Sequence, residues 1–165
     1  MRAVWLCVRL MFSLWRPLFT GNDPIMTEEP RICLNPATLS PPTGSPASPF
    51  YSWVVRRGPM VFLAGMSPYA QDKTLVGTTI GEQARQCFRN MAAAMAAAGG
   101  SIADVCRITI HVQATELQRD VYPEVNPVCH EVFGMAPPAR VVIGGIALPR
   151  PSELVMISAT AVLPG

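Results

Sequence analysis

The amino-acid sequence predicts an α+β domain with two helices packed on one face of a mixed β-sheet. At 165 residues the chain has room for one domain with a substantial core, and 50% of its residues are hydrophobic. Its apolar residues alternate in some segments, as in strands, and recur every three or four positions in others, as in helices. The resulting order is strand, strand, helix, strand, helix, strand, strand, which is typical of α+β domains.

The first strands are predicted as a hairpin. Two apolar runs, 51–56 and 60–64, flank the turn formed by Arg57, Gly58 and Pro59. Upstream, residues 26–49 are rich in Pro, Ser and Thr and are expected to form an irregular lead-in on the domain surface. Within that lead-in, the short run 31–34 predicts an additional edge strand. The folded domain proper is expected to span 50–165.

The clearest helix is predicted over 79–98. Thr79 and Glu82 have the spacing of a capping box, and Gly99 and Gly100 provide a stop. The expected buried stripe comprises Ala84, Cys87, Phe88, Met91, Met95 and Ala98.

The second half predicts a strand over 104–112, a helix over 115–133, and strands over 140–146 and 154–163. In the second helix Pro123 is expected near the start, while Pro127 either kinks the helix or begins it with Asn126 as the cap. The expected buried stripe of this helix comprises Tyr122, Val125, Val128, Cys129 and Phe133.

The last predicted strand carries no charged side chain on either face. Because the helices cover one face of the sheet only, the other face needs a cover of its own. We expect oligomerisation through the sheet, and the alternative is that loops alone cover this face.

Composition narrows the possible partners. The formal net charge of +2 gives no broad basic field, so nucleic acid is not an expected partner. The chain has only two histidines, His111 and His130, and its five scattered cysteines form no C-x-x-C pair, so no metal is expected. The cysteines suit a reducing compartment, here taken as the cytoplasm, with Cys87, Cys106 and Cys129 in the core.

Residues 1–25 differ in composition from the rest of the chain, with three arginines in an apolar run and no acidic residue before Asp23. Arg9 interrupts what a secretory signal would need, and the run is too short and too charged to span a membrane. An organelle-targeting peptide remains an alternative. The plainest interpretation is an upstream extension with Met26 as the true start, so 1–25 are excluded from the predicted fold.

Arg140 is the first candidate for a binding residue. Pro137 and Pro138 restrict the backbone before it, so the preceding helix must end and Arg140 opens the next strand at a fixed place. A guanidinium group can hold a carboxylate through two parallel hydrogen bonds. The alternative is a solvated or ion-paired arginine at a strand end.

From about 48 to 163 the sequence resembles the reactive-intermediate deaminase family, also called the RidA or YjgF-like family. The matching pieces occur in order along the chain. They are Ser48-Pro49-Phe50-Tyr51, Phe62-Leu63-Ala64-Gly65, Gln83-Ala84-Arg85-Gln86 with Asn90, Ala98-Gly99-Gly100-Ser101 with Asp104-Val105, Val125-Asn126, Pro138-Ala139-Arg140 and Leu148-Pro149.

The resemblance implies a chorismate-mutase-like fold, a homotrimer with a barrel-like core and ligand clefts between subunits, and no cofactor. It also implies hydrolysis of enamine and imine intermediates, such as 2-iminobutanoate and 2-iminopropanoate, to 2-oxo acids and ammonia. Carried over by position, Arg140 holds the substrate carboxylate, while Tyr51, Asn126 and Gly65 line the binding site.

The sequence departs from the family pattern at two positions. Met156 stands where the deaminases carry a water-positioning glutamate, and a thioether cannot replace a carboxylate in that role. Val142 stands where many members have a cysteine. One extra residue in the 149–154 turn could bring Glu153 toward the site instead.

Three hypotheses follow. The first is an enamine/imine deaminase that relies on Arg140 and substitute groups. The second is a relative acting on another small carboxylated metabolite, as in pyrimidine or aminomuconate breakdown, with His111 as a candidate acid or base. The third is a non-catalytic trimer that binds a carboxylate or another protein.

Overall fold

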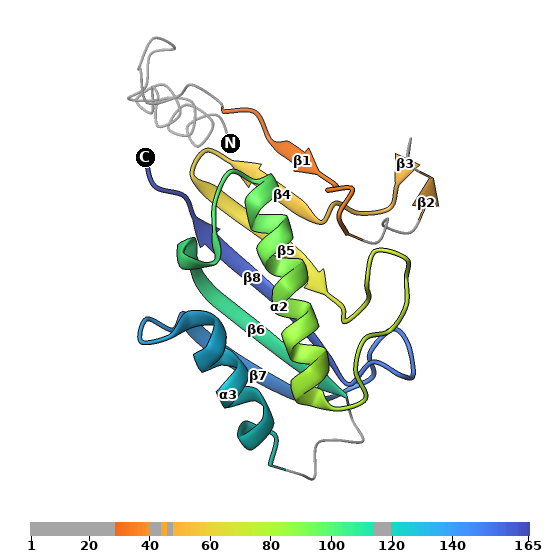
Figure 1. The fold of residues 1–165 in the computed structure, drawn as a ribbon. Helices are drawn as coiled ribbons and strands as arrows, with labels where there is room; N and C mark the ends of the chain where they lie inside the picture. The colour runs from red at the N-terminus through yellow and green to blue at the C-terminus, as the bar shows by residue number, and fades with distance from the viewer. Residues whose placement is uncertain (1–28, 40–43, 46–47, 114–119) are drawn as a thin grey trace, which may run out of the picture.

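The computed structural model describes residues 29–39, 44–45, 48–113 and 120–165, which form a mixed β-sheet with two helices on one face (Figure 1). The predicted α+β class is confirmed. The sheet has six strands in the order β1-β4-β5-β8-β6-β7. All neighbours are antiparallel except β6 and β7, which are parallel and are joined through a helix.

The strand bounds lie close to those expected from the sequence. The six strands are β1 (Ile32–Leu34), β4 (Val54–Arg57), β5 (Met60–Met66), β6 (Val105–Gln113), β7 (Ala139–Ile146) and β8 (Val155–Val162). A separate two-stranded sheet is formed by β2 (Gly44–Ser45) and β3 (Ser48–Pro49). The predicted hairpin is β4 and β5, which pair around a turn at Gly58 with positive φ.

The lead-in contributes to the folded domain. Its predicted edge strand is β1, which pairs with β4, and Asn35 Oδ1 accepts a hydrogen bond from the Trp53 amide at 2.9 Å. Leu39 is buried, so this part of the lead-in is packed rather than lying only on the surface. The interpretation of residues 1–25 lies outside the described residues and stays a prediction.

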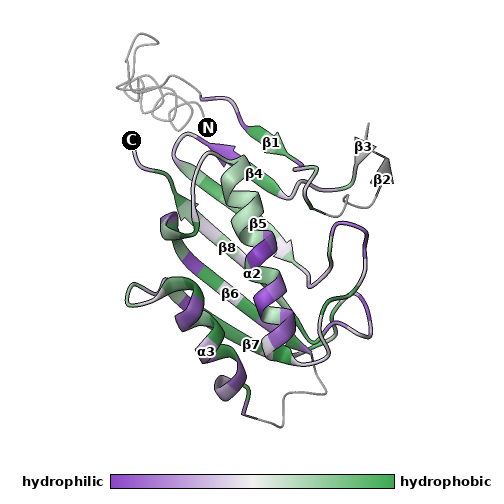
Figure 2. Ribbon diagram, viewed as in Figure 1, coloured by the Kyte–Doolittle hydropathy of each residue, from purple (hydrophilic) through white to green (hydrophobic). Residues whose placement is uncertain are grey.

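Helix α2 (Ile80–Ala97) has the ends that its sequence predicts. Thr79 and Glu82 form the reciprocal capping box. At the other end Gly99 has φ +86°, the Gly100 amide donates to the Met95 carbonyl and the Gly99 amide to the Ala96 carbonyl, which is a Schellman motif. The whole predicted stripe is buried. Figure 2 shows hydrophilic residues in the first part of this helix and mildly hydrophobic ones in its second part.

Helix α3 (Tyr122–Phe133) is shorter than expected. The predicted start at Thr115 lies outside the described residues, but Asp120 and Val121 are not helical, so the helix begins at Tyr122. Pro123 lies in its first turn, where a missing N–H costs nothing. The alternative with Asn126 as the cap is wrong, because Asn126 and Pro127 both lie inside the helix.

Two side chains differ from the predicted core. Tyr122 was expected to be buried but is 48% exposed, because it lies at the outer end of α3 beside Arg140. Cys106 was also expected in the core and is exposed, whereas Cys87 and Cys129 are buried as predicted. Cys106 lies at the start of β6, where the pairing with β8 is irregular between Val105 and Arg107.

The sheet face opposite the helices keeps apolar side chains in contact with solvent. Phe62 of β5 is 47% exposed, and Val141, Ile143 and Val162 are also exposed. Register places these residues beside Thr109, Ser158 and Thr160, with Arg107 next to Thr160. This surface, called here the open face, is mainly apolar and uncharged apart from its arginines. The described residues place no helix over it (Figure 1). In the same ranges, no helix has the length and apolar character needed to cross a bilayer.

Candidate functional site

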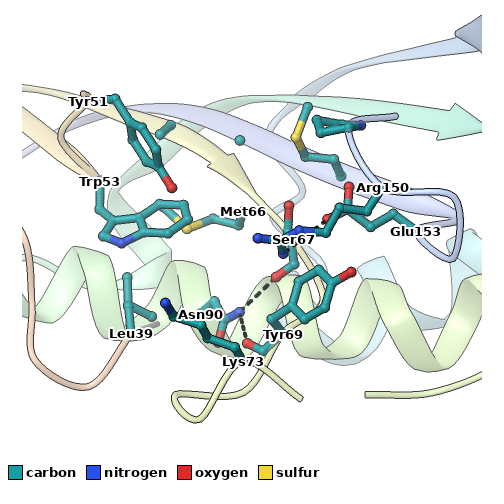
Figure 3. Close-up of a pocket in the computed structure, with 14 residues that line it drawn as sticks. Leu39, Tyr51, Trp53, Met66, Ser67, Tyr69, Lys73, Asn90, Arg150 and Glu153 are labelled. Atoms are coloured by element: carbon teal, nitrogen blue, oxygen red, sulfur yellow. Dashed lines mark hydrogen bonds and ion pairs between the residues drawn. The ribbon is translucent and has the colours of Figure 1, made fainter. Parts of the chain in front are cut away.

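A cavity of about 520 Å³ lies at the end of β5, next to the turn that joins β7 and β8 (Figure 3). Tyr51 and Trp53 form one wall and meet edge to face, with their ring centroids 5.0 Å apart. Arg150, Glu153 and Tyr69 lie on the opposite side. The remaining lining residues are Leu39, Ala64, Gly65, Met66, Ser67, Lys73, Asn90, Pro149 and Met156. This space is called here the Gly65 cavity.

The position of the Met156 side chain leaves room only for a glycine at residue 65. A Cβ atom added at Gly65 would lie 2.5 Å from Met156 Sδ, which is closer than non-bonded atoms approach. The thioether therefore lies directly over the glycine and forms part of the cavity wall.

The polar end of the Gly65 cavity carries both charge signs. Arg150 stacks on Tyr69, with its guanidinium carbon 4.3 Å from the ring centroid. Its Nη1 atom lies 3.8 Å from Glu153 Oε1. Burial raises the pKa of Glu153, while a hydrogen bond from Ser67 and the charge of Arg150 act in the opposite direction. Lys73, which has a positive φ, adds a second cation to the lining.

Helix α2 fixes the backbone around this cavity. Asn90 Nδ2 donates to the Ser67 and Tyr69 carbonyls, both at 2.9 Å. Gln83 Nε2 donates to the Ser152 carbonyl at 3.1 Å, and Gln83 Oε1 accepts from the Leu154 amide at 2.8 Å. The segment after β5 and the β7–β8 turn are therefore both held by amide side chains of a rigid helix.

Arg140 lies in a second hollow, of about 510 Å³, between α3 and the start of β7. Its Nη1 atom donates to Asn126 Oδ1 at 2.9 Å and to Cys129 Sγ at 3.6 Å. The Tyr122 ring lies against the guanidinium group, 5.6 Å from its carbon to the ring centroid. No carboxylate of the described chain forms an ion pair with Arg140. Its remaining donors are thus free to bind an anion.

The two hollows do not meet within one chain. Strands β5 and β7 are separated by β8 and β6, which puts them roughly 14 Å apart at about 4.8 Å per strand step. Register also pairs Arg140 with Ile108, which is buried toward the helices, whereas Met156 pairs with His111 on the opposite side of β6. Arg140 and Met156 therefore lie on opposite faces of the sheet.

The residues predicted for one site thus divide into two groups. Tyr51, Gly65 and Met156 line the Gly65 cavity, while Arg140 and Asn126 line the second hollow. Val142 lines neither, because it packs partly buried against the core.

His111 also lines neither hollow. Its Nδ1 atom is buried, with no hydrogen-bond partner among the described residues. In those same ranges, no three histidine, cysteine or carboxylate side chains are grouped closely enough to hold a metal ion.

Several lining residues were not expected from the sequence. Trp53, Ser67, Tyr69, Lys73 and Arg150 all face the Gly65 cavity. Tyr69, Lys73 and Arg150 lie in turns, whose course depends on contacts with α2, so neither periodicity nor spacing signals them. Asn90 was predicted only as one of the residues that carry the family resemblance. Its two hydrogen bonds to the segment after β5 give it a structural role beside the cavity.

Comparison with known proteins supports a single family. The profile of the family described as Endoribonuclease L-PSP matches residues 43–163. A RutC family protein of Pyrococcus horikoshii is 34% identical over 113 residues, covering 67% of this chain and 85% of the relative. A protein of Dermatophagoides farinae named 2-iminobutanoate/2-iminopropanoate deaminase is 31% identical over 101 residues, covering 61% of this chain and 76% of the relative.

The similarity of the fold to solved structures supports the same family. A solved structure of a YjgF/YER057c/UK114 family member from Mycobacterium tuberculosis superposes with a TM-score of 0.62 and 30% identity, covering 81% of this chain and all of that one. The matched span includes both helices and strands β4 to β8. The chain therefore belongs to the Endoribonuclease L-PSP family, which is the RidA/YjgF family that its sequence resembles.

Proposed function

We propose that this protein hydrolyses enamine and imine forms of small 2-amino acids to 2-oxo acids and ammonia. The observation that carries the proposal is the state of Arg140. Its guanidinium group is held in place by Asn126, and no carboxylate of the described chain neutralises it. A positioned arginine of this kind is suited to binding the carboxylate of a small substrate.

The proposed site is completed by a second copy of the chain. Arg140 does not line the Gly65 cavity of its own chain, because β7 lies three strands away from β5 and because Arg140 and Met156 face opposite sides of the sheet. The open face, with Phe62, Val141 and Ile143 exposed, supplies apolar surface for contact between copies. A closed ring of three copies would bring the Arg140 edge of one to the Gly65 cavity of the next.

The chemistry then needs only positioning and proton transfer. With the substrate carboxylate on Arg140, the imine carbon extends into the neighbouring Gly65 cavity, beside Tyr51. Water adds to that carbon, the C=N electron pair moves to nitrogen, and the resulting carbinolamine releases ammonia to leave the 2-oxo acid. Holding water and imine together supplies much of the rate, so no metal or organic cofactor enters the proposal.

The Dermatophagoides farinae relative named 2-iminobutanoate/2-iminopropanoate deaminase supports this substrate class. The family description names an endoribonuclease, but a net charge of +2 and a cavity of about 520 Å³ suit a small metabolite better than RNA. Met156 lines the cavity at a position where a carboxylate would assist hydrolysis. For this reason two alternative functions stay open. These are another small carboxylated substrate and a non-catalytic trimer that binds a carboxylate.

The test measures ammonia and 2-oxo acid release from freshly generated 2-iminobutanoate and 2-iminopropanoate. We expect turnover by the wild-type protein, loss of about 100-fold or more in kcat/KM in Arg140→Ala, and no loss in Arg89→Ala, an exposed arginine of α2. Wild-type protein without turnover, but active as Met156→Glu, would favour the alternatives. Arg140→Ala with unchanged kcat/KM would contradict the proposed anchor.

The cytoplasm is our proposed compartment. Four cysteines in the described ranges are free thiols, which suits a reducing environment. A relative from Schizosaccharomyces pombe, 27% identical over 132 residues, is named as mitochondrial, which makes the mitochondrion the alternative compartment. Imaging of fluorescent fusions beginning at Met1 and at Met26 tests the proposal, and a mitochondrial signal from the Met1 fusion alone would contradict it.

A further inference from the structure

Glu153 carries a buried carboxyl group whose hydrogen-bonding capacity is not fully used. Its side chain is 1% exposed, and its Oε2 atom has no hydrogen-bond partner among the described residues. Buried polar side chains are normally paired, because an unpaired one costs about 1–3 kcal/mol. The other buried polar side chain, Gln83, is paired through both its amide nitrogen and its oxygen. Among the described residues, His111 Nδ1 is the only other buried side-chain polar atom without a partner.

The position of Glu153 is fixed. The turn carrying it is closed by a hydrogen bond from its own amide to the Arg150 carbonyl at 3.0 Å. The residues on either side of it, Ser152 and Leu154, are both bonded to Gln83 of α2. The Glu153 side chain lines the Gly65 cavity together with Ser67 and Met156. The Glu153 carboxyl group, of which one oxygen is unpaired, therefore lies in the wall of a space large enough for water and a small substrate.

The charged and titratable groups around Glu153 come from four segments. Arg150 is on the same turn, Lys73 and Tyr69 are on the segment between β5 and α2, Tyr51 precedes β4, and Cys87 faces it from α2. Burial and the charge of Glu153 both raise the pKa of Cys87, so this thiol stays neutral. Burial likewise raises the pKa of Glu153 above its ordinary value, toward the range in which a carboxylate is a more effective base.

We propose that Glu153 is the general base for the water that attacks the imine carbon, an assignment that rests on the proposed function. Its carboxylate accepts a proton from the water as the new C–O bond forms and the C=N electron pair moves to nitrogen. The carboxyl group then returns that proton to nitrogen, which gives the carbinolamine. In the next step the carboxylate takes the hydroxyl proton of the carbinolamine and passes it to nitrogen, as the C=O bond forms, the C–N bond breaks and ammonia leaves. The carboxylate is regenerated, and no oxidant, reductant or further reactant is needed.

This assignment accounts for Met156. A thioether can neither take a proton nor orient water as a carboxylate does, and Met156 packs over Gly65 as part of the wall. In this assignment Glu153, on the neighbouring β7–β8 turn, transfers the proton instead. The hydrogen bonds from Gln83 hold that turn in place.

The first test compares Glu153→Gln and Glu153→Asp with wild type in imine hydrolysis. We expect Glu153→Gln to lower kcat by about 100-fold or more with KM little changed, and Glu153→Asp to restore part of it. The wild-type rate should rise with pH through the pKa of Glu153, and this limb should vanish in Glu153→Gln. Glu131→Gln, an exposed glutamate paired with Arg85, is the control and should stay active. A Glu153→Gln variant with wild-type kcat and pH profile overturns the assignment and leaves the proposed function standing.

The second test needs no turnover. Binding of 2-oxobutanoate, an anion, should raise the pKa of a carboxylate beside it, so wild-type protein should take up protons on binding. Calorimetry in buffers of different ionisation enthalpy measures this uptake, which should disappear in Glu153→Gln with binding retained. Uptake that persists in Glu153→Gln overturns the assignment. Uptake that depends on Glu153 in a protein that releases no ammonia overturns the proposed function, and the base role with it.

Discussion

Gln83 brackets Glu153, because its side-chain amide bonds the residues on both sides of that carboxyl group. Gln83 Nε2 donates to the Ser152 carbonyl at 3.1 Å, and Gln83 Oε1 accepts from the Leu154 amide at 2.8 Å. The partners are 69 and 71 residues away in sequence. A helix side chain thus sets the conformation of a distant turn, and through it the position of the one buried acid that lines the Gly65 cavity in the described chain.

Replacing Gln83 by leucine should destabilise the protein by about 1–3 kcal/mol, because the Leu154 amide and the Ser152 carbonyl lose a partly buried hydrogen-bond partner. Denaturant unfolding at neutral pH measures this. Gln86→Leu, one position away from the buried stripe and bonded only to Asn90, is the matched control and should cost less. Equal effects of the two substitutions would contradict the bracketing role of Gln83.

Glu153→Gln should stabilise the fold at neutral pH even as it removes activity. Because burial raises the pKa of Glu153 in the folded state, the folded protein binds a proton more readily than the unfolded chain. The stability contributed by the protonated acid is fully present below its ordinary pKa and is lost as pH rises through the raised value.

The melting temperature of Glu153→Gln should therefore exceed that of wild type at pH 7, and the difference should shrink as the pH is lowered through the raised pKa of Glu153 toward the ordinary pKa of a glutamate, about 4.3. Scanning calorimetry across that range measures the effect. A lower melting temperature for Glu153→Gln at pH 7 would show that the carboxylate is stabilised in the fold, contrary to this account.

Gly65→Ala should cost about 1–3 kcal/mol, because the added methyl group meets Met156 Sδ. If that contact is the cause, the cost should fall in a Met156→Ala background, where the thioether is absent. A double-mutant cycle in denaturant measures the coupling energy between the two sites. Additive effects would mean that Met156 does not lie over Gly65.

The groups that hold Arg140 should affect ligand binding in a graded way. Tyr122→Leu should weaken 2-oxobutanoate binding by about two- to fivefold, because it removes the ring beside the guanidinium group, while Tyr122→Phe should retain it. Asn126→Ala should weaken binding further by releasing Nη1. Calorimetric titration measures both. Wild-type affinity in Asn126→Ala would mean that Arg140 needs no support from α3.

The sequence allowed α2 to be predicted nearly to the residue, because its signals are local. The capping box, the apolar repeat and the two glycines each act within one or two helical turns. The expected start of the second helix was wrong, since an apolar pattern alone does not distinguish Asp120 and Val121 from a first turn that begins at Tyr122. The uncharged last strand predicted that the second face of the sheet is buried by oligomerisation, which stays a prediction; in the single chain, Phe62 and Ile143 of this face are exposed.

The candidate site was only partly predictable. The sequence predicted Arg140, Asn126, Tyr51 and Gly65 as residues of a cleft between subunits. Within one chain, Tyr51 and Gly65 line one hollow while Arg140 and Asn126 line another, so their union in one site stays a prediction. The strand order depends on the parallel pairing of β6 with β7, which is a long-range contact. Glu153 was foreseen only from the length of its turn, because the bonds from Gln83 that fix it are also long-range.

The most direct test of the shared site is complementation between two inactive variants. Arg140→Ala removes the anchor and leaves the Gly65 cavity intact, whereas Gly65→Leu fills the cavity and leaves Arg140 intact. Neither homo-oligomer should bind 2-oxobutanoate. Unfolding and refolding an equal mixture should restore about one quarter of the sites by random assembly, since a working site needs one copy of each kind in the right order. Calorimetric stoichiometry near that value supports a site built from two copies, and a mixture with no binding, beside wild-type protein that binds, would contradict it.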